Sequence, residues 1–324
     1  MLAFLIRRIS QSAIVLLVMS MLVFVGVFYI GNPIDIMIAP DATPAEYARA
    51  VKELGLDKPM LTQYWIFLKD AVHGDLGNSF VYNEPALKLI LQRMPATMEL
   101  AVTAMLMAVF IGIPLGMLAG IKHDTMLGRS IMRFSILGFS LPTFWVGLMF
   151  IILFSVQLGW LPSGGRGTTV ELLGVPVSFL TWDGIQHLIL PAMNLALFKT
   201  SLAIRLSRAG VQENLQMDYV KFAKAKGLSN TRIIGLHVMK NIMIPVITVL
   251  GMEFGGLIAF AVVTETIFSW PGMGKLVIDS IGVLDRPVIV AYLLITVTMF
   301  IIINLLVDII YSILDPRVRL GDHN

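Results

Sequence analysis

The sequence predicts an all-α integral membrane protein with six transmembrane helices. Of its 324 residues, 57% are hydrophobic and 14% are charged, whereas a typical soluble domain has roughly 25% charged residues. The mean hydropathy is +0.83. Several apolar segments reach the roughly 20 residues that a helix needs to cross a hydrocarbon core of about 30 Å. Since only helices and closed barrels satisfy their backbone polar groups in lipid, we expect a helical bundle.

Six segments are long and apolar enough to span a membrane. Four carry no charge: residues 9–32, 100–121, 134–165 (with the helix ending near Leu158) and 287–307. The other two carry one charge each, Lys199 in 188–204 and Glu253 in 241–264. The first segment is longer than the apolar core of a signal peptide, and no small-residue cleavage site precedes the loop with Asp35. We therefore expect it to be a retained span.

The orientation of the spans follows from lysine and arginine, which are enriched in cytoplasmic loops. Three segments are basic, and all three lie on one side if the six spans alternate: the N-terminus, residues 122–133 and residues 205–243. The segments on the other side, 33–97 and 159–187, are neutral to acidic. We therefore expect both termini to be cytoplasmic.

The spans divide the chain into four parts. These are residues 1–32 with the N-terminus and first span, an outer subdomain 33–97, a five-span core 98–314, and a cytoplasmic tail 315–324. The outer subdomain is predicted to contain two helices. One covers residues 43–56 and begins at Thr43 and Pro44, and the other covers residues 59–72.

The cytoplasmic segment 205–243 has seven basic residues against Glu213 and Asp218. One interpretation is a loop that only holds the topology and contacts anionic lipid. The residue pattern favours a docking element instead, with a short helix lying across the membrane surface. We expect Asp218 to cap this helix, Gly227 to end it in a left-handed conformation and Ser229 to cap the next helix. Three of its residues share one face at spacings i, i+3 and i+4: Tyr219, Phe222 and Ala223.

This segment also carries a family resemblance. The stretch DYVKFAKAKGLSNTRIIGLHVMKNIMIP, residues 218–245, resembles the cytoplasmic coupling loop of ABC importer permeases of the dipeptide/oligopeptide/nickel class. Ala223 and Gly227 match the second alanine and the glycine of the superfamily motif, whereas Lys240 stands where that motif has proline. Other segments resemble the same class, in the same order along the chain: LGLDKPMLTQYW, HGDLGNSF, PATMELAV, SLPTFWVGLMF, GWLPSGG, TETIFSWPGMGKLVIDSI and NLLVDIIYSILDPRVR.

The resemblance implies the permease subunit of an ATP-driven importer in a bacterial inner membrane, which forms half of the translocation path. The implied partners are a second related permease, two cytoplasmic ATPases that carry ATP and magnesium, and an external solute-binding protein. The segment 218–228 is expected to dock on an ATPase and to transmit its closure to the spans. The residues assigned to this contact are Asp218, Tyr219, Phe222, Ala223, Lys224, Lys226, Gly227 and Leu228. The resemblance is compatible with several cargoes, namely peptides, nickel chelates, opines and glutathione.

Sequence motifs for catalysis, metal binding and nucleotide binding are absent. There is no cysteine, no H-E-x-x-H and no G-x-S-x-G, and the five histidines are scattered. The nearest match to the phosphate-binding motif G-x-x-x-x-G-K-[ST] is the run from Gly272 to Lys275, which lacks the upstream glycine and is followed by Leu276. We therefore expect a transport subunit and not an enzyme, with no catalytic residue, metal site, cofactor or nucleic-acid partner of its own.

Lys199 and Glu253 are the most informative single residues, because a charge at mid-bilayer costs roughly 2.5–3.5 kcal/mol. One hypothesis is that they pair across the fourth and fifth spans, or line a polar path and contact a zwitterionic substrate. The alternative is that Lys199 extends toward the cytoplasmic surface while Glu253 pairs structurally elsewhere. The alternative function is an ion-coupled secondary transporter that uses the two residues as a relay, although six spans without an inverted repeat disfavour it.

Other residues in or beside the spans have structural interpretations. Glycines at four-residue spacing in the second span favour close helix packing over a flexible gating helix. They are Gly112, Gly116 and Gly120. Glu265 and Asp308 lie at span ends, where we expect partly solvated structural anchors. Trp270 lies in an outer turn, where we expect an aromatic residue at the membrane interface.

Overall fold

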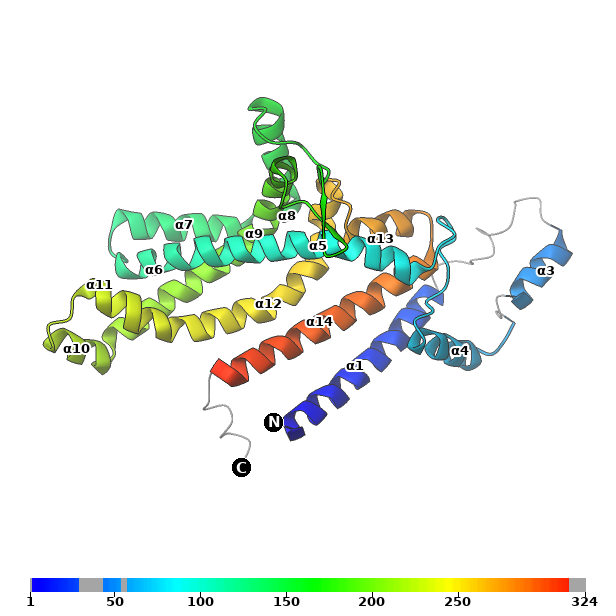
Figure 1. Cartoon of the computed structure of the whole chain (residues 1–324), viewed down its shortest axis with the longest axis horizontal. Coiled ribbons are helices and arrows are strands. Elements are labelled where there is room, and N and C mark those ends of the chain that lie inside the picture. The colour runs from blue at the N-terminus through cyan, green and yellow to red at the C-terminus, as the bar shows by residue number, and fades with distance from the viewer. Residues whose placement is uncertain (1, 29–42, 54–56, 315–324) are drawn as a thin grey trace. The chain divides into compact units, whose positions relative to one another are not determined.

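The structure, a computed structural model, describes residues 2–28, 43–53 and 57–314, which are mostly helical (Figure 1). The chain forms two compact units. The first consists of Met1–Ala96 and Pro271–Ile301, and the second of Thr97–Trp270 and Ile302–Asn324. Within the described residues, five helices are long and apolar enough to cross a membrane, or six if one bent helix pair forms a single span. The predicted all-α membrane fold is therefore confirmed.

The first unit contains the N-terminal helix and the two predicted outer helices. Its elements are α1 (Leu2–Phe28), α3 (Pro44–Glu53), α4 (Met60–Val72), the beginning of α5 (Ala86–Met107), α13 (Met273–Gly282) and the beginning of α14 (Arg286–Leu314). The α3 and α4 helices lie where the sequence predicts them. The predicted ends of the first span at residue 32 and of the first outer helix at residue 56 lie outside the described residues, as does the tail 315–324.

Local side-chain contacts hold the outer helices. At the start of α3, the Thr43 N–H donates to Glu46 Oε2 at 2.8 Å and the Glu46 N–H donates to Thr43 Oγ1 at 3.4 Å, a reciprocal cap. The hydrogen bond from the Thr43 backbone lowers the pKa of Glu46. The α4 helix packs on α1, where the Tyr64 hydroxyl lies 2.9 Å from Ser20 Oγ and the Tyr64 ring lies 5.5 Å from the ring of Phe24.

A buried aspartate fastens the segment that precedes α5. Asp285 is fully buried just before α14. Its carboxylate accepts hydrogen bonds from Ser79 Oγ and from the Phe80 N–H, the latter at 3.1 Å. Residues 79 and 80 are therefore tied to the connection between α13 and α14.

The second unit is organised around the long helix α9. Four helices pack along α9 (Trp182–Gln216), among other elements that contact it: α6 (Ile113–Ile121), α7 (Met126–Ser140), α8 (Thr143–Phe150) and α12 (Met239–Ile267). A Cβ added at Gly116 would lie 2.5 Å from the carbonyl oxygen of Ile204, and one at Gly112 would lie 2.6 Å from the Cβ of Ala203. The predicted close packing of the glycine row is confirmed, because a larger residue would push α6 away from α9.

The third predicted span is not one helix. Two helical segments, α7 and α8 with its π-helical continuation η2 (Ile151–Gln157), meet at Leu141 and Pro142 with a bend of 107°. Leu141 is extended, with φ −83° and ψ 136°, because a following proline disfavours the helical region. The sequence SLPTFW therefore interrupts the apolar run, and the expectation of a continuous helix over residues 134–158 was wrong.

The other spanning helices are longer than their apolar segments. Residues Ala86–Ile121 form one helical stretch, in which α5 and α6 are joined by the π-helical turn η1 (Ala108–Gly112). It begins inside the predicted outer segment 33–97, and α9 continues to Gln216, inside the predicted loop 205–243. At about 1.5 Å per residue, these helices exceed the roughly 30 Å of the hydrocarbon core. Hydropathy marks the part in lipid, and protein packing supports the polar extensions.

Candidate functional site: the α10 helix and two ion pairs

The predicted docking helix is present as α10 (Asp218–Ala225). Asp218 does not cap it, contrary to the expectation. Met217 holds the N-cap position with an extended backbone and makes no side-chain cap. Asp218 is the first helical residue, and its Oδ1 accepts a hydrogen bond from Lys221 Nζ at 2.8 Å. A carboxylate in the first turn still stabilises the helix through the helix dipole.

Gly227 ends α10 as predicted. Its φ is +76°, in the left-handed region that favours glycine. The Gly227 N–H donates to the carbonyl of Lys224 at 2.9 Å, and the Leu228 N–H donates to the carbonyl of Ala223 at 3.2 Å. These two hydrogen bonds form a Schellman motif. Ser229 then caps the next helix by accepting a hydrogen bond from the Arg232 N–H, also as predicted.

The inner face of α10 packs against its own unit. Val220 and Ala223 are buried together with residues of α9, of the π-helical segment η3 (Ile233–Val238) and of α12: Val211, Ile233, Val238 and Ile242. Tyr219 and Leu228 pack against this core, and the Tyr219 hydroxyl donates to Asn214 Oδ1 at 2.8 Å. Helical spacing alone did not identify Val220, which lies on this same face.

The outer face of α10 is smaller than predicted. Of the three residues expected to share a docking face, only Phe222 points outward, with 62% of its surface exposed. The Lys226 ammonium lies 4.6 Å from the Phe222 ring centroid, and Lys224 is exposed. The expectation that Tyr219 and Ala223 join Phe222 was wrong, because those two side chains are used in packing. One apolar ring with the cation of Lys226 beside it remains accessible.

Lys199 and Glu253 form an ion pair between α9 and α12, as one of the two hypotheses for them required. Lys199 lies 17 residues from either end of α9, and Glu253 lies 14 residues from either end of α12. The pair therefore lies at the middle of both helices. The lysine side chain is 8% exposed and the glutamate side chain 40%, so the carboxylate is open on one side.

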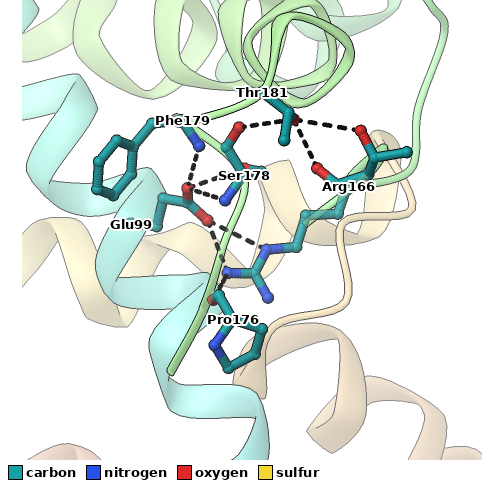
Figure 2. A network of polar contacts seen from close by, with 7 residues as sticks. Glu99, Arg166, Pro176, Ser178, Phe179 and Thr181 are labelled. Atoms are coloured by element: carbon teal, nitrogen blue, oxygen red, sulfur yellow. Dashed lines mark hydrogen bonds and ion pairs between the residues drawn. The ribbon is translucent and has the colours of Figure 1, made fainter. Parts of the chain in front are cut away.

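A second ion pair, which the sequence did not indicate, joins α5 to the segment between η2 and α9 (Figure 2). Arg166 donates to Glu99 Oε2 from Nε at 3.1 Å and from Nη2 at 2.7 Å. Glu99 Oε1 accepts hydrogen bonds from the Ser178 N–H at 2.7 Å, from Ser178 Oγ at 2.8 Å and from the Phe179 N–H at 2.9 Å. The side chains of Glu99 and Arg166 are 3% and 11% exposed.

This network holds an antiparallel hairpin on the end of the helix bundle. Its strands are β1 (Val170–Leu172) and β2 (Val175–Val177). Arg166 Nη2 also donates to the carbonyl of Pro176 at 2.6 Å, as Figure 2 shows. Its guanidinium carbon lies 5.8 Å from the ring centroid of Trp270. Trp270 is fully buried, so its ring packs inside the protein and does not face lipid headgroups.

Glu265 lies close to this region and is also fully buried. Its Oε1 accepts a hydrogen bond from Thr97 Oγ1 at 2.6 Å. The residue is therefore an anchor, as expected, but a desolvated one and not a partly solvated one.

Comparisons with known proteins decide the family. Residues 112–320 match the family described as binding-protein-dependent transport system inner membrane component, and residues 1–101 match the corresponding N-terminal family. The chain belongs to this family of inner membrane components.

Relatives support the assignment over nearly the whole chain, and a solved structure shares the fold over 70% of it. The dipeptide transport system permease protein DppB of Escherichia coli K12 is 37% identical over 98% of this chain and 99% of its own length. The di/tripeptide permease DppB of Pseudomonas aeruginosa UCBPP-PA14 is 38% identical, and the glutathione permease GsiC of Escherichia coli O6:H1 is 36% identical, with the same coverage. A chain of the MetNI methionine ABC transporter, in inward-facing conformations, has a TM-score of 0.54 at 12% identity, covering 70% of this chain and 96% of that chain.

This inner membrane component is therefore a multi-pass permease subunit of an ABC importer, and the resemblance noted in the sequence is confirmed. The ion-coupled secondary transporter is not supported. The relatives of this chain are transport subunits, in line with the expectation that the chain is not an enzyme.

Proposed function

We propose that the chain forms half of the translocation path of an ATP-driven importer of dipeptides or oligopeptides. The cargo class rests on the relatives, which are named for dipeptide, di/tripeptide and glutathione transport. All three cargoes are short peptides with free ends, so a peptide is favoured over a nickel chelate or an opine. The single observation that carries the ATP-driven part is the outer face of α10.

The accessible face of α10 has the chemistry of a protein-docking surface. Phe222 offers one exposed aromatic ring with the cation of Lys226 beside it, and Lys224 is exposed on the same helix. An aromatic residue at the centre of a contact with charged residues at its rim is typical of protein interfaces. The buried inner face and the Schellman motif at Gly227 hold this surface in one orientation. We assign to it the docking of a cytoplasmic ATPase.

The proposed assembly follows from this assignment. Two cytoplasmic subunits bind ATP and magnesium and hydrolyse ATP, a second related permease completes the path, and an external solute-binding protein delivers the cargo. Both termini of this chain and the basic segment 205–243 lie on the cytoplasmic side. Closure of the ATPases displaces α10 and switches the path from outward-facing to inward-facing.

Within the membrane, Lys199 and Glu253 are proposed to line the path. A charged group that is open to its surroundings near mid-bilayer is expected to face a polar space and not lipid. The 40% exposed side chain of Glu253 meets this condition.

A pull-down of the tagged chain from detergent tests the docking of an ATPase. The variants are Phe222→Ser and, as a matched control, Met126→Ser, because Met126 is 64% exposed and lies outside α10. ATPase subunits should co-purify with the wild type and the control but not with Phe222→Ser, and ATP-dependent uptake should be lost in parallel. If no ATPase co-purifies with the wild type, and uptake follows an ion gradient instead, the proposed function is refuted.

A further inference from the structure

A row of aromatic and charged side chains crosses three helices of the second unit. Arg205 of α9 places its guanidinium carbon 4.3 Å from the ring centroid of Phe139 on α7. The Phe139 ring stacks on Phe198 of α9 with centroids 4.5 Å apart. The ammonium of Lys199 lies 5.1 Å from the Phe198 centroid and pairs with Glu253 on α12. We call these five residues the cation–aromatic row.

The two ends of the row differ in how their charges are compensated. At one end Lys199 is neutralised by Glu253. At the other end, no carboxylate of the described residues pairs with Arg205, and its Nε is buried without a hydrogen-bond acceptor there. A buried donor that is left unpaired costs free energy. Arg205 is half-buried, and its two Nη groups are not among the buried unpaired atoms, so a carboxylate would bind these groups and not the covered Nε.

The opposite end has a free acceptor. Lys199 uses Oε2 of Glu253, and in the part of the chain that the structure describes no hydrogen bond reaches Oε1. The Glu253 side chain is 40% exposed, and Phe139 between the two ends is also exposed. The row is therefore partly exposed at Arg205, Phe139 and Glu253 and buried at Lys199, with an anion-binding group at one end and a cation-binding group at the other.

We propose that the cation–aromatic row is a binding site for the two ends of a short zwitterionic peptide. Arg205 binds the terminal carboxylate, Glu253 binds the terminal ammonium, and the rings of Phe139 and Phe198 contact the residues between. The proposal rests on the proposed function and adds the cargo-recognition residues to it. The row is no longer than its four contacts laid end to end, which about five residues of extended peptide cover at roughly 3.3–3.6 Å each. A dipeptide is shorter than this, so it is expected to engage one end of the row at a time.

The position of the row favours a peptide over a lipid headgroup. Phe198 and Lys199 lie at the middle of α9, and the Arg205 side chain reaches back toward them, because helical side chains tilt toward the N-terminus of their helix. The guanidinium therefore lies against an aromatic ring of the mid-helix region. A phospholipid headgroup lies at the membrane surface, near the start of the basic segment 205–243, whereas the Arg205 guanidinium points away from that surface toward the mid-helix region.

The test uses the complete importer, reconstituted in vesicles with its partner subunits and its binding protein. Uptake of dialanine is compared with uptake of dialaninamide, which lacks the terminal carboxylate, for the wild type and Arg205→Gln. The binding protein is the same in both assays, so its own preference cancels when the two uptake ratios are compared. Arg205→Gln should lower the preference for the free carboxylate about tenfold or more, the range for a hydrogen bond to a charged group.

Three further variants make the result specific. Arg208→Gln, one turn further along α9 and also with a buried unpaired Nε, should keep the wild-type ratio. Arg205→Lys retains the charge and should restore part of the preference if the glutamine variant assembles poorly. Glu253→Gln should instead reduce discrimination between dialanine and N-acetyl-dialanine.

The proposal is overturned if Arg205→Gln slows uptake of dialanine and dialaninamide by the same factor, because that is the signature of a structural role. It is also overturned if the effect depends on anionic lipid in the vesicles and not on the peptide terminus, which would assign Arg205 to a lipid headgroup. In either case ATP-dependent uptake by the wild type would leave the proposed function standing. Absence of ATP-dependent uptake by the wild type would refute that function itself.

Discussion

Replacing Glu99 by glutamine tests the ion pair that holds the hairpin β1–β2. The substitution preserves the shape of the side chain but removes its charge. Glu99 accepts five hydrogen bonds, two of them from Arg166. A glutamine keeps only one acceptor oxygen, so its amide group must face either Arg166 or the N–H groups of Ser178 and Phe179. Each orientation leaves buried donors without acceptors.

The expected cost is large because both partners are desolvated. The Glu99 and Arg166 side chains are 3% and 11% exposed, and removing one partner of a buried ion pair costs about 3–5 kcal/mol. A matched control is Glu84→Gln, which removes a carboxylate 3.1 Å from Lys88 in a pair whose side chains are 43% and 55% exposed. An exposed pair of this kind contributes only about 0.2–1 kcal/mol.

Amide hydrogen exchange at Ser178 and Phe179 measures the effect directly, since both amides donate to Glu99. A loss of about 3 kcal/mol from the local opening free energy speeds exchange more than about 100-fold. Exchange in Glu84→Gln should stay within a few-fold of the wild type. If Glu99→Gln exchanges no faster than this control, the ion pair does not hold the hairpin, and the reasoning from burial fails.

The remaining predictions concern α10, the glycine row and the mid-membrane pair. Gly227→Ala should cost about 1–2 kcal/mol in the left-handed conformation and reduce ATPase co-purification. Gly235→Ala, at an unobstructed helical position, should leave co-purification unchanged. Equal effects of the two substitutions would show that the turn at Gly227 does not hold the docking surface. Gly116→Ala places a Cβ 2.5 Å from a carbonyl oxygen and should lower the Tm of the purified complex by several degrees through overpacking. An unchanged Tm would contradict the close approach of α6 to α9. Glu253→Gln should lower the Tm less than Glu99→Gln does, because water screens a side chain that is 40% exposed; a larger loss would show that the mid-membrane pair is mainly structural.

Features that depend on neighbouring residues were predictable from the sequence. The left-handed Gly227 and the Ser229 cap each involve residues within a few positions along the chain, so residue type and spacing identify them. The glycine row was also predictable, since small residues at four-residue spacing have few uses in a span other than close packing. The pairing of Lys199 with Glu253 could be proposed because two isolated charges at similar depth have few other partners.

Features that depend on the tertiary fold were not predictable. Glu99 and Arg166 are 67 residues apart, and nothing in the local sequence of either distinguishes it from an exposed charge in a loop. The predicted composition of the docking face of α10 was wrong for a related reason. Both of its faces carry apolar residues, and periodicity does not show that Val220 and Ala223 face α9 and α12 while Phe222 faces outward. Pro142 was a local signal for the broken span, but the continuous apolar run around it masked the break.

The core beneath α10 determines which helices a displacement of α10 would move. Val220 and Ala223 share one buried cluster with Val211 of α9 and Ile242 of α12. The α10 helix contacts α9 and η3, and η3 continues into α12, so a push on α10 acts on α9 and, through η3, on α12. The same two helices are joined at their midpoints by Lys199 and Glu253. Sliding of α9 past α12 would break this pair and open the core under α10, whereas movement of both as one body costs neither contact. We therefore expect the path to open between the α9–α12 pair and the second permease subunit. The exposed carboxylate of Glu253 would then lie on that side of the pair.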